Sequence, residues 1–526
     1  MESAQTLPRS RTEPATRYPG LRAVAVLGAL MALIALRIPF LDDPALWIDE
    51  AFSIHHAKHD LRMIWGEGWE LESSPPLYYT VYWLWSRIVG EGEVLARLLS
   101  LLLTAGAAYF VFRATALLAG RRAGILSTML FLAQPLVFHY SLEIRPYPLQ
   151  LLLLAMALAS FARALVDFEQ ARITGPGIAA RRAAPIVAFC ALATYTHATT
   201  PIFVLALGLT ALLFGLRRHA SRGYWITVAA SAGTWLAAIQ PQLLVMAQVL
   251  QTNQEGIAWI PSPVDPRSLF GVFRSLAVGE NVWNTVTSWL VGITTVAVIG
   301  WSAWRLRRRP APLFIGFSLP VTGFALLWSV SLAQSVLLPR TALWVAIPLC
   351  LLVGCAFSTI RANAPPLRLA AGALTTGLIL MLSLMSVINL NARNGDRPWA
   401  RFIEAFQSEV TPEDEVVAVD PELLCVLDAY ADTGLRSASW SVLDRGSAAI
   451  FRSRQRIGLG CNERPGRSVG DLMDLIGAGR RVWVLAGDDR QRRDVEAMLA
   501  MLPTSVRAQP RLEWRGRTHV WQLRPD

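Results

Sequence analysis

Trp47-Ile48-Asp49-Glu50-Ala51-Phe52 begins a few residues after the first long apolar run of the chain, residues 21–40. About 20 apolar residues are enough to cross the roughly 30 Å hydrocarbon core of a bilayer as a helix. Two adjacent carboxylates therefore lie where a membrane helix leaves the bilayer. Carboxylates in such a place can take a proton from a hydroxyl group or hold a cation. The stretch predicts a membrane protein with reactive groups at the membrane surface.

The composition also indicates a polytopic membrane protein. Of the 526 residues, 53% are hydrophobic and 17% are charged, and the mean hydropathy is +0.39, which is too apolar for a soluble enzyme of this length. Apolar runs recur up to about residue 390 and then stop. We expect about eleven membrane-spanning helices, at residues 21–40, 94–118, 123–138, 147–166, 184–198, 199–216, 224–249, 282–304, 313–332, 341–357 and 369–390.

The arginines predict the orientation of these helices. The net charge is +11, Lys58 is the only lysine, and the arginines cluster between apolar runs. This pattern fits the excess of basic residues in cytoplasmic loops better than it fits nucleic-acid binding. No small-residue cleavage pattern follows the first run, so we interpret it as a retained signal-anchor with a cytoplasmic N-terminus. One extracytoplasmic face then carries Asp49, Glu50, the 139–146 loop, His197, Arg340 and everything after residue 390.

We expect three regions: a cytoplasmic tail at 1–20, a membrane domain at 21–390 with a long first outer loop at 41–93, and an extracytoplasmic α/β domain at 391–526. Pro75 to Gly90 is aromatic but only about 15 residues long, which favours a helix lying in the interface. In the last region, helix-like and strand-like segments alternate at Trp399–Val410, Glu415–Val419, Val482–Ala486, Arg490–Leu502 and His519–Leu523. Cys425 and Cys461 lie there and could form a disulfide outside the cytoplasm.

Several short motifs between residues 20 and 390 carry a family resemblance. They are Trp47-Ile48-Asp49-Glu50-Ala51, Ser74-Pro75-Pro76-Leu77-Tyr78-Tyr79, Arg97, Tyr140-Ser141-Leu142-Glu143-Ile144-Arg145-Pro146-Tyr147, Tyr195-Thr196-His197 and Leu338-Pro339-Arg340. Together they resemble the polyprenyl-phosphate-sugar glycosyltransferases of the GT-C fold, in particular the family 39-like group related to protein O-mannosyltransferases and lipid A aminoarabinose transferase. That family often has His-Pro-Pro where this chain has Ser74-Pro75-Pro76.

The resemblance implies an α-helical polytopic membrane protein of GT-C type in a bacterial inner membrane. The implied partners are a polyprenyl-phosphate-linked sugar as donor, a glycan, lipid or protein as acceptor, and membrane lipids. A transporter or a flippase for lipid-linked substrates is the alternative, but such proteins place ionisable groups near the bilayer midplane, and the predicted spans here are almost free of acids. A non-catalytic scaffold would not need paired acids and opposing arginines on one face.

Moving a sugar from a lipid phosphate to a hydroxyl group requires a base for the proton and cations for the departing phosphate. Asp49 is the candidate base, and displacement in one step would invert the anomeric carbon. The alternative for Asp49 is a helix N-cap. Glu50 could orient the acceptor, bind a metal or face water.

Glu143, like Glu50, is a candidate catalytic residue. It shares a short outer loop with Arg145, and the alternative is that the two form a local surface ion pair. The planar guanidinium group suits a phosphate, so Arg145 and Arg340 are candidate phosphate ligands and Arg97 is a weaker third. Tyr147 and His197 are candidate substrate-binding residues, although a lone histidine is more often a packing residue. A divalent cation could bind near His55, His56 and His59, but their spacing fits no zinc pattern and favours a solvated helix.

Overall fold

The computed structural model describes most of the chain. The described residues are 19–42, 46, 48–66, 68–69, 75–173, 175–252, 263–280, 285–360, 365–395, 399–419, 421–430, 439–442, 467–486, 489–500, 502–503, 506–514 and 518–525. Ser74 and Cys461, which the sequence analysis singled out, lie outside these residues.

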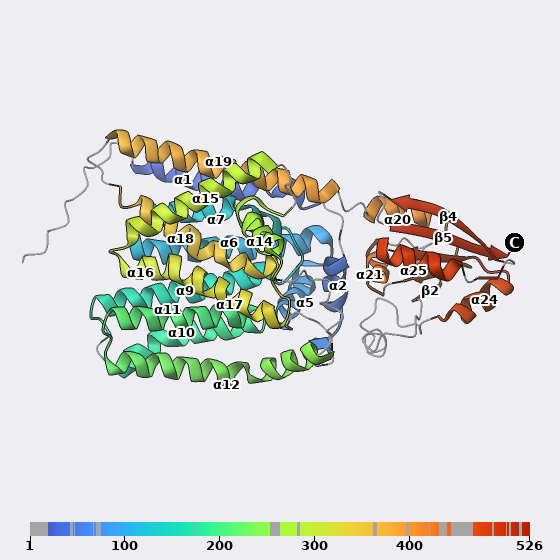
Figure 1. Ribbon diagram of the computed structural model, residues 1–526, viewed down its shortest axis with the longest axis horizontal. Coiled ribbons are helices and arrows are strands. Elements are labelled where there is room, and N and C mark those ends of the chain that lie inside the picture. Colours follow the sequence, from blue (N-terminus) through green and yellow to red (C-terminus); the bar gives the residue numbers. More distant parts are fainter. Residues whose placement is uncertain are drawn as a thin grey trace, which may run out of the picture.

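Long apolar helices form a bundle, and a smaller sheet-containing domain lies beyond one end of it (Figure 1). The helices of the bundle are α1 (Pro19–Ala35), α6 (Glu93–Ala119), α7 (Arg121–Ala133), α8 (Pro135–Tyr140), α9 (Tyr147–Glu169), α10 (Pro176–Thr194), α11 (Thr200–Arg217), α12 (Arg222–Thr252), α14 (Pro266–Val278), α15 (Thr285–Leu306), α16 (Pro310–Leu313), the π-helical η2 (Phe314–Ser318), α17 (Leu319–Ala333), the 3-10 helix η3 (Arg340–Val345), α18 (Ala346–Phe357) and α19 (Pro365–Gly395). Short helices at the end near the smaller domain are η1 (Ile38–Phe40), α2 (Ile48–His56), α3 (Leu61–Trp65) and α5 (Leu77–Val89).

Among the described residues, nine helices are long and apolar enough to cross a membrane. They correspond to nine of the eleven predicted spans. The other two predicted spans are also helical but shorter: α1 has 17 residues, and the 123–138 span is divided into α7 and α8. The division occurs at Gln134-Pro135, because the proline has no N–H to continue the helix and Gln134 instead caps α8 by accepting from the backbone N–H of Val137 at 2.7 Å.

The helix predicted for the interface is present as α5, with 13 residues, and it does not appear among the nine candidate spans. Its tyrosines Tyr78, Tyr79 and Tyr82 face the protein and are buried, whereas Leu84 and Ile88 are exposed. An amphipathic helix of this kind suits a position at the membrane surface.

The smaller domain contains a five-stranded mixed sheet in the order β2-β1-β3-β5-β4. Its elements are α20 (Trp399–Gln407), β1 (Glu415–Ala418), α21 (Pro421–Tyr430), β2 (Ser439–Val442), α24 (Val469–Gly477), β3 (Val482–Ala486), α25 (Asp489–Leu499), β4 (Val506–Trp514) and β5 (Thr518–Pro525). Strand β1 is parallel to β2 and β3, and β5 is antiparallel to β3 and β4. Cys425 of α21 is disulfide-bonded.

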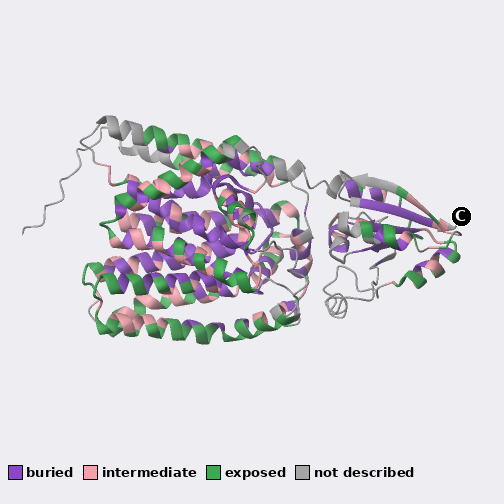
Figure 2. Ribbon diagram, viewed as in Figure 1, coloured by how far each residue is buried: buried purple, intermediate pink, exposed green. Residues whose placement is uncertain are grey.

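Helix α2 connects the two parts of the structure. Ala51 and Phe52 belong to the same buried apolar cluster as Phe402 of α20 and Leu424 of α21. Figure 2 shows that most buried residues lie inside the bundle, and the same colouring marks buried residues in α2, which faces the smaller domain. The helix that carries the two acids is therefore packed on both sides.

Candidate active site

Asp49 and Glu50 lie in the first turn of α2, which begins at Ile48. Asp49 is thus inside the helix, and its position does not match the N-cap alternative. Successive helical residues point about 100° apart. The two side chains accordingly enter different surroundings: the Asp49 side chain is 30% exposed, and the Glu50 side chain is completely buried.

Asp49 faces two arginines from distant parts of the sequence. Its Oδ2 atom lies 3.6 Å from Arg340 Nη1 and 3.9 Å from Arg145 Nη2. Arg145 is further fixed because its Nη1 donates to the backbone oxygen of Asp49 at 3.2 Å and to Ser53 Oγ at 3.1 Å. A half-exposed carboxylate between two guanidinium groups is a place where a second anion can compete for the cations.

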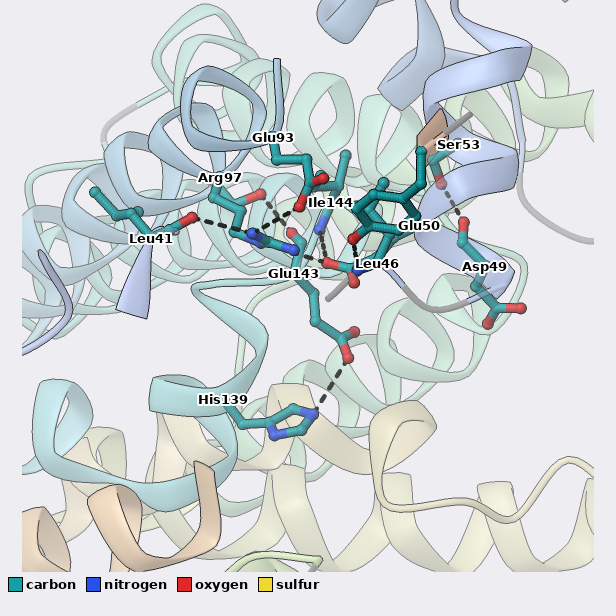
Figure 3. A network of polar contacts seen from close by, with 12 residues as sticks. Leu41, Leu46, Asp49, Glu50, Ser53, Glu93, Arg97, His139, Glu143 and Ile144 are labelled. Carbon is teal, nitrogen blue, oxygen red and sulfur yellow. Dashed lines mark hydrogen bonds and ion pairs between the residues drawn. The ribbon is translucent and has the colours of Figure 1, made fainter. Parts of the chain in front are cut away.

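Glu50 belongs to a separate, buried network at the start of α6. Its Oε1 accepts from the backbone N–H of Ile144 at 3.1 Å and lies 3.9 Å from Arg97 Nε. Arg97 Nη1 also donates to the Leu41 backbone oxygen at 3.0 Å and lies 3.3 Å from Glu93 Oε2. Figure 3 shows Arg97 among these groups, with the Asp49 carboxylate pointing away from them. The network joins α2, α6 and the 139–146 loop.

Glu143 and Arg145 do not lie at the surface. Both are buried, and Glu143 Oε1 lies 3.2 Å from His139 Nε2, one helical turn earlier. The backbone oxygen of Glu143 accepts from Ser100 Oγ of α6 at 2.5 Å. These contacts hold the loop that presents Arg145 to Asp49.

Aromatic side chains line the region next to the arginines. The ring centroids of Tyr140 and Tyr147 are 4.7 Å apart, and those of Tyr147 and His197 are 5.3 Å apart. Tyr140 donates to Glu280 Oε1 at 2.9 Å. Burial, together with the charges of Arg145 and Arg340, lowers the pKa of His197 to about 3, so the imidazole is neutral at pH 7. His197 Nδ1 lies 2.9 Å from Thr199 Oγ1.

The sequence favoured a solvated helix for His55, His56 and His59. The structure differs from this prediction. His56 is 1% exposed and packs on Tyr79, with the ring centroids 4.3 Å apart. Burial is the main cause that lowers the pKa of His55 to about 4 and that of His56 to about 3, and His59 adds to both shifts. Within the part of the chain that the structure describes, no group of three His, Cys, Asp or Glu side chains could hold a metal ion.

Several residues of this region were not identified from the sequence. Arg37, at the end of the first span, is fully buried; it donates to Ser141 Oγ at 2.7 Å and lies over the Phe138 ring at 4.3 Å. A signal for it was available, because an arginine at the outer end of a span departs from the arginine-inside pattern. Glu93 and Tyr430 carry no such signal. Glu93 resembles a surface acid, and Tyr430, whose hydroxyl accepts from the backbone N–H of Leu46, follows Leu46 by 384 residues in the chain.

These elements define a class: a multi-span helical membrane protein with a polar site at one end of the bundle, beneath a small α/β domain. The fold is that of the GT-C glycosyltransferases. Residues 73–175 match the family model described as dolichyl-phosphate-mannose-protein mannosyltransferase, and this segment includes Arg97, Glu143, Arg145 and Tyr147.

Solved structures of the same fold are similar over nearly the whole chain. The crystal structure of ArnT from Cupriavidus metallidurans bound to undecaprenyl phosphate is 15% identical, covers 96% of this chain and 98% of its own, and has a TM-score of 0.61. The apo state of that protein has a TM-score of 0.62 at the same identity and coverage. An Archaeoglobus fulgidus oligosaccharyltransferase tethered to an acceptor peptide is 14% identical, covers 89% of this chain and 69% of its own, and has a TM-score of 0.50. No curated protein matches the sequence. The predicted resemblance to the GT-C glycosyltransferases is confirmed.

Proposed function

We propose that this protein is a membrane glycosyltransferase that moves a sugar from a polyprenyl-phosphate donor to a hydroxyl group of an acceptor. The observation that carries the proposal is the Asp49 carboxylate, 3.6 Å from one guanidinium group and 3.9 Å from another. The matched family model supports glycosyl transfer, and the ArnT complex with undecaprenyl phosphate supports the class of lipid. The acceptor is a glycan, a lipid or a protein.

In this proposal Arg145 and Arg340 exchange one anion for another. Without donor, they hold the Asp49 carboxylate. The phosphodiester of the donor carries one negative charge on two non-bridging oxygens, so it can take the place of the carboxylate between the guanidinium groups, and the second charge that develops as the sugar leaves strengthens this contact. Asp49 is then free to accept a proton. The base would become available only when the donor is in place.

The transfer is proposed as a single displacement. The acceptor oxygen forms a bond to the anomeric carbon while the bond from that carbon to the phosphate oxygen breaks, which inverts the configuration. The proton of the acceptor hydroxyl passes to Asp49, and the lipid phosphate leaves with the electron pair, held by Arg145 and Arg340. Tyr147 and His197 line the site and contact the substrate. No step requires a metal ion.

Glu50, Arg97 and Glu143 have another role in this proposal. All three side chains are buried. Arg97 of α6 contacts Glu50 of α2, and Glu143 contacts His139, so they act as positioning residues for α2 and for the 139–146 loop.

The sugar-transfer site lies on the extracytoplasmic face of a bacterial plasma membrane, with the N-terminus and the arginine-rich loops in the cytoplasm. The membrane domain at 21–390 carries the chemistry, and the domain at 391–526 covers it.

The test compares Asp49→Asn with Asp60→Asn. Asp60 caps α3 by accepting from the Met63 N–H at 2.8 Å, and asparagine caps equally well, so the control has the same chemical change without a loss of structure. The purified full-length proteins are given undecaprenyl-phosphate sugars labelled in the sugar, together with an envelope extract that supplies acceptor hydroxyl groups, and release of undecaprenyl phosphate is measured by mass spectrometry. Binding of undecaprenyl phosphate itself is measured separately.

Asp49→Asn should lower turnover by about 10²- to 10⁴-fold, the usual contribution of a general base. It should bind undecaprenyl phosphate as tightly as the unchanged protein or more tightly, because a competing carboxylate has been removed. Asp60→Asn should behave as the unchanged protein. Turnover of Asp49→Asn within a few-fold of normal would remove Asp49 as the base, and weaker lipid binding would contradict the exchange of anions.

A further inference from the structure

A second site lies between α9, α10, α11 and α12, far along these helices from Asp49. It is a cavity of about 860 Å³, within the roughly 300–1,000 Å³ typical of ligand pockets. Its walls are almost entirely apolar, and among the described residues that line it Arg182 is the only charged one. All four helices are candidate membrane spans, and the rest of the protein covers only a small part of α10 and of α12.

The cavity is therefore reached from the bilayer. Figure 1 shows α12 along the outer edge of the bundle, and Figure 2 shows it mostly exposed. The lining extends along α12 from Gly223 to Leu236. From Arg222 to Trp235 the helix rises by about 20 Å, and half of a bilayer's hydrocarbon core measures roughly 15 Å. A lipid acyl chain that enters at the Arg222 end can be buried over its whole length.

The entrance is strongly basic. The ends of α9 to α12 and their two connecting loops carry two acids, Asp167 and Glu169, and more than three times as many arginines, namely Arg163, Arg172, Arg181, Arg182, Arg217, Arg218 and Arg222. Asp167 is buried and lies 2.8 Å from Arg182, and Glu169 lies 3.7 Å from Arg218, which ties the two loops together. Arg181, Arg217 and Arg222 are exposed and add positive charge beside the apolar opening.

From this geometry we infer a binding site for a membrane glycerophospholipid with an anionic head group, taken from the leaflet on the arginine-rich side. The acyl chain occupies the cavity, and the head group meets the arginines. The site is distinct from that of the proposed sugar donor, which meets Arg145 and Arg340 at the opposite end of the helices. The inference does not depend on the proposed function.

Gly208 allows a direct test, because it lines the cavity and a side chain added there would meet no atom within 4 Å. Gly208→Phe places an aromatic ring at the cavity wall, and Gly208→Leu places a smaller side chain there. Gly233 of α12 is the matched control: an added side chain also meets nothing there, and it does not line the cavity. Gly233→Phe places the same bulk in a lipid-facing helix and leaves the cavity open.

The full-length proteins are purified, delipidated and incubated with phosphatidylglycerol or phosphatidylcholine, and bound lipid is counted by native mass spectrometry on the monodisperse fraction. The unchanged protein and Gly233→Phe should retain one phosphatidylglycerol more than Gly208→Phe, with Gly208→Leu between them. Equal retention in all four proteins would overturn the site.

A second pair of variants tests the head group without touching the packing. Arg181→Gln/Arg222→Gln should lower the preference for phosphatidylglycerol by roughly 25-fold, because an arginine beside an anionic lipid is worth about fivefold in affinity. Arg121→Gln/Arg308→Gln, two exposed arginines elsewhere in the arginine-rich loops, should leave the preference unchanged. If the unchanged protein holds phosphatidylcholine as strongly as phosphatidylglycerol, the anionic head group is wrong.

Discussion

Arg97→Met should destabilise the protein without removing donor binding. The Arg97 and Glu50 side chains are both fully buried. The change takes the guanidinium group from Glu50, from Glu93 and from the Leu41 backbone oxygen. The Glu93 side chain is 28% exposed and can turn to water, but Glu50 is left as a buried carboxylate that keeps its bond from the Ile144 N–H.

The expected loss follows from the burial of the pair. Removing one partner of a buried ion pair costs about 3–5 kcal/mol, because the other charge is left uncompensated. At about 2 °C per kcal/mol for a large domain, this corresponds to a decrease in apparent Tm of roughly 6–10 °C. Arg97→Met/Glu50→Gln should recover most of the loss, since the amide oxygen can still accept from Ile144 and no buried charge remains.

The assay is thermal unfolding of the three proteins in one detergent, at one heating rate, with undecaprenyl phosphate binding measured at a temperature where all three are folded. Binding should be unchanged per folded molecule, because Arg145 keeps its own bonds to the Asp49 backbone oxygen and to Ser53 Oγ. An Arg97→Met protein that unfolds at the normal temperature, or a double variant that is less stable than the single one, would refute the buried-charge argument. Binding that is lost both in the folded Arg97→Met protein and in the folded double variant would restore Arg97 as a phosphate ligand.

Three further predictions concern other groups. Arg340→Met should weaken undecaprenyl phosphate binding by roughly 10- to 150-fold in a titration, the equivalent of one charged hydrogen bond worth about 1.5–3 kcal/mol, with the apparent Tm nearly unchanged. Burial lowers the pKa of His56 from 6.5 to about 3, so between these pH values the unfolded chain binds more protons than the folded protein. The stability of the folded protein therefore decreases as the pH falls below about 6.5. His56→Gln should flatten this pH dependence in thermal melts between pH 8 and 5. Lys58→Met, which removes the exposed 3.2 Å pair with Asp428, should change stability by less than about 1 kcal/mol, and a larger change in a denaturation series would contradict a weak surface pair.

The membrane part of the fold was predictable because hydropathy and arginine placement are properties of single segments. Nine predicted spans are helices of sufficient length, and the acids of α2 lie beside the arginines chosen from the sequence. The break at Gln134 was missed because hydropathy does not register how one proline interrupts an apolar run. In the smaller domain, β1, β3 and β5 were anticipated as strand-like segments that alternate with helix-like ones, whereas β2 and the bulged β4 were not.

The division of roles among the site residues could not be predicted, because it depends on which way each side chain points. Arg97 and Arg145 look alike in the sequence, since each is an arginine near the outer end of a span. In the structure Arg97 is enclosed by two glutamates, and Arg145 reaches Asp49. Likewise Glu143 was a candidate catalytic residue in the sequence, whereas in the structure it is buried and lies 3.2 Å from His139. Such choices are set by helix rotation and loop conformation, which sequence spacing does not determine.

The position of Asp49 therefore depends on more than its two arginines. Helix α2 has nine residues, and helices shorter than about 12 residues are marginal on their own in water. One face holds Asp49 at the arginines, the next holds Glu50 in the buried network, and a third packs Phe52 against the smaller domain. Since the domain contact and the Glu50 network both fix the same short helix, a change in either one should displace the carboxylate from the arginines, even though neither contains a group that touches the substrate.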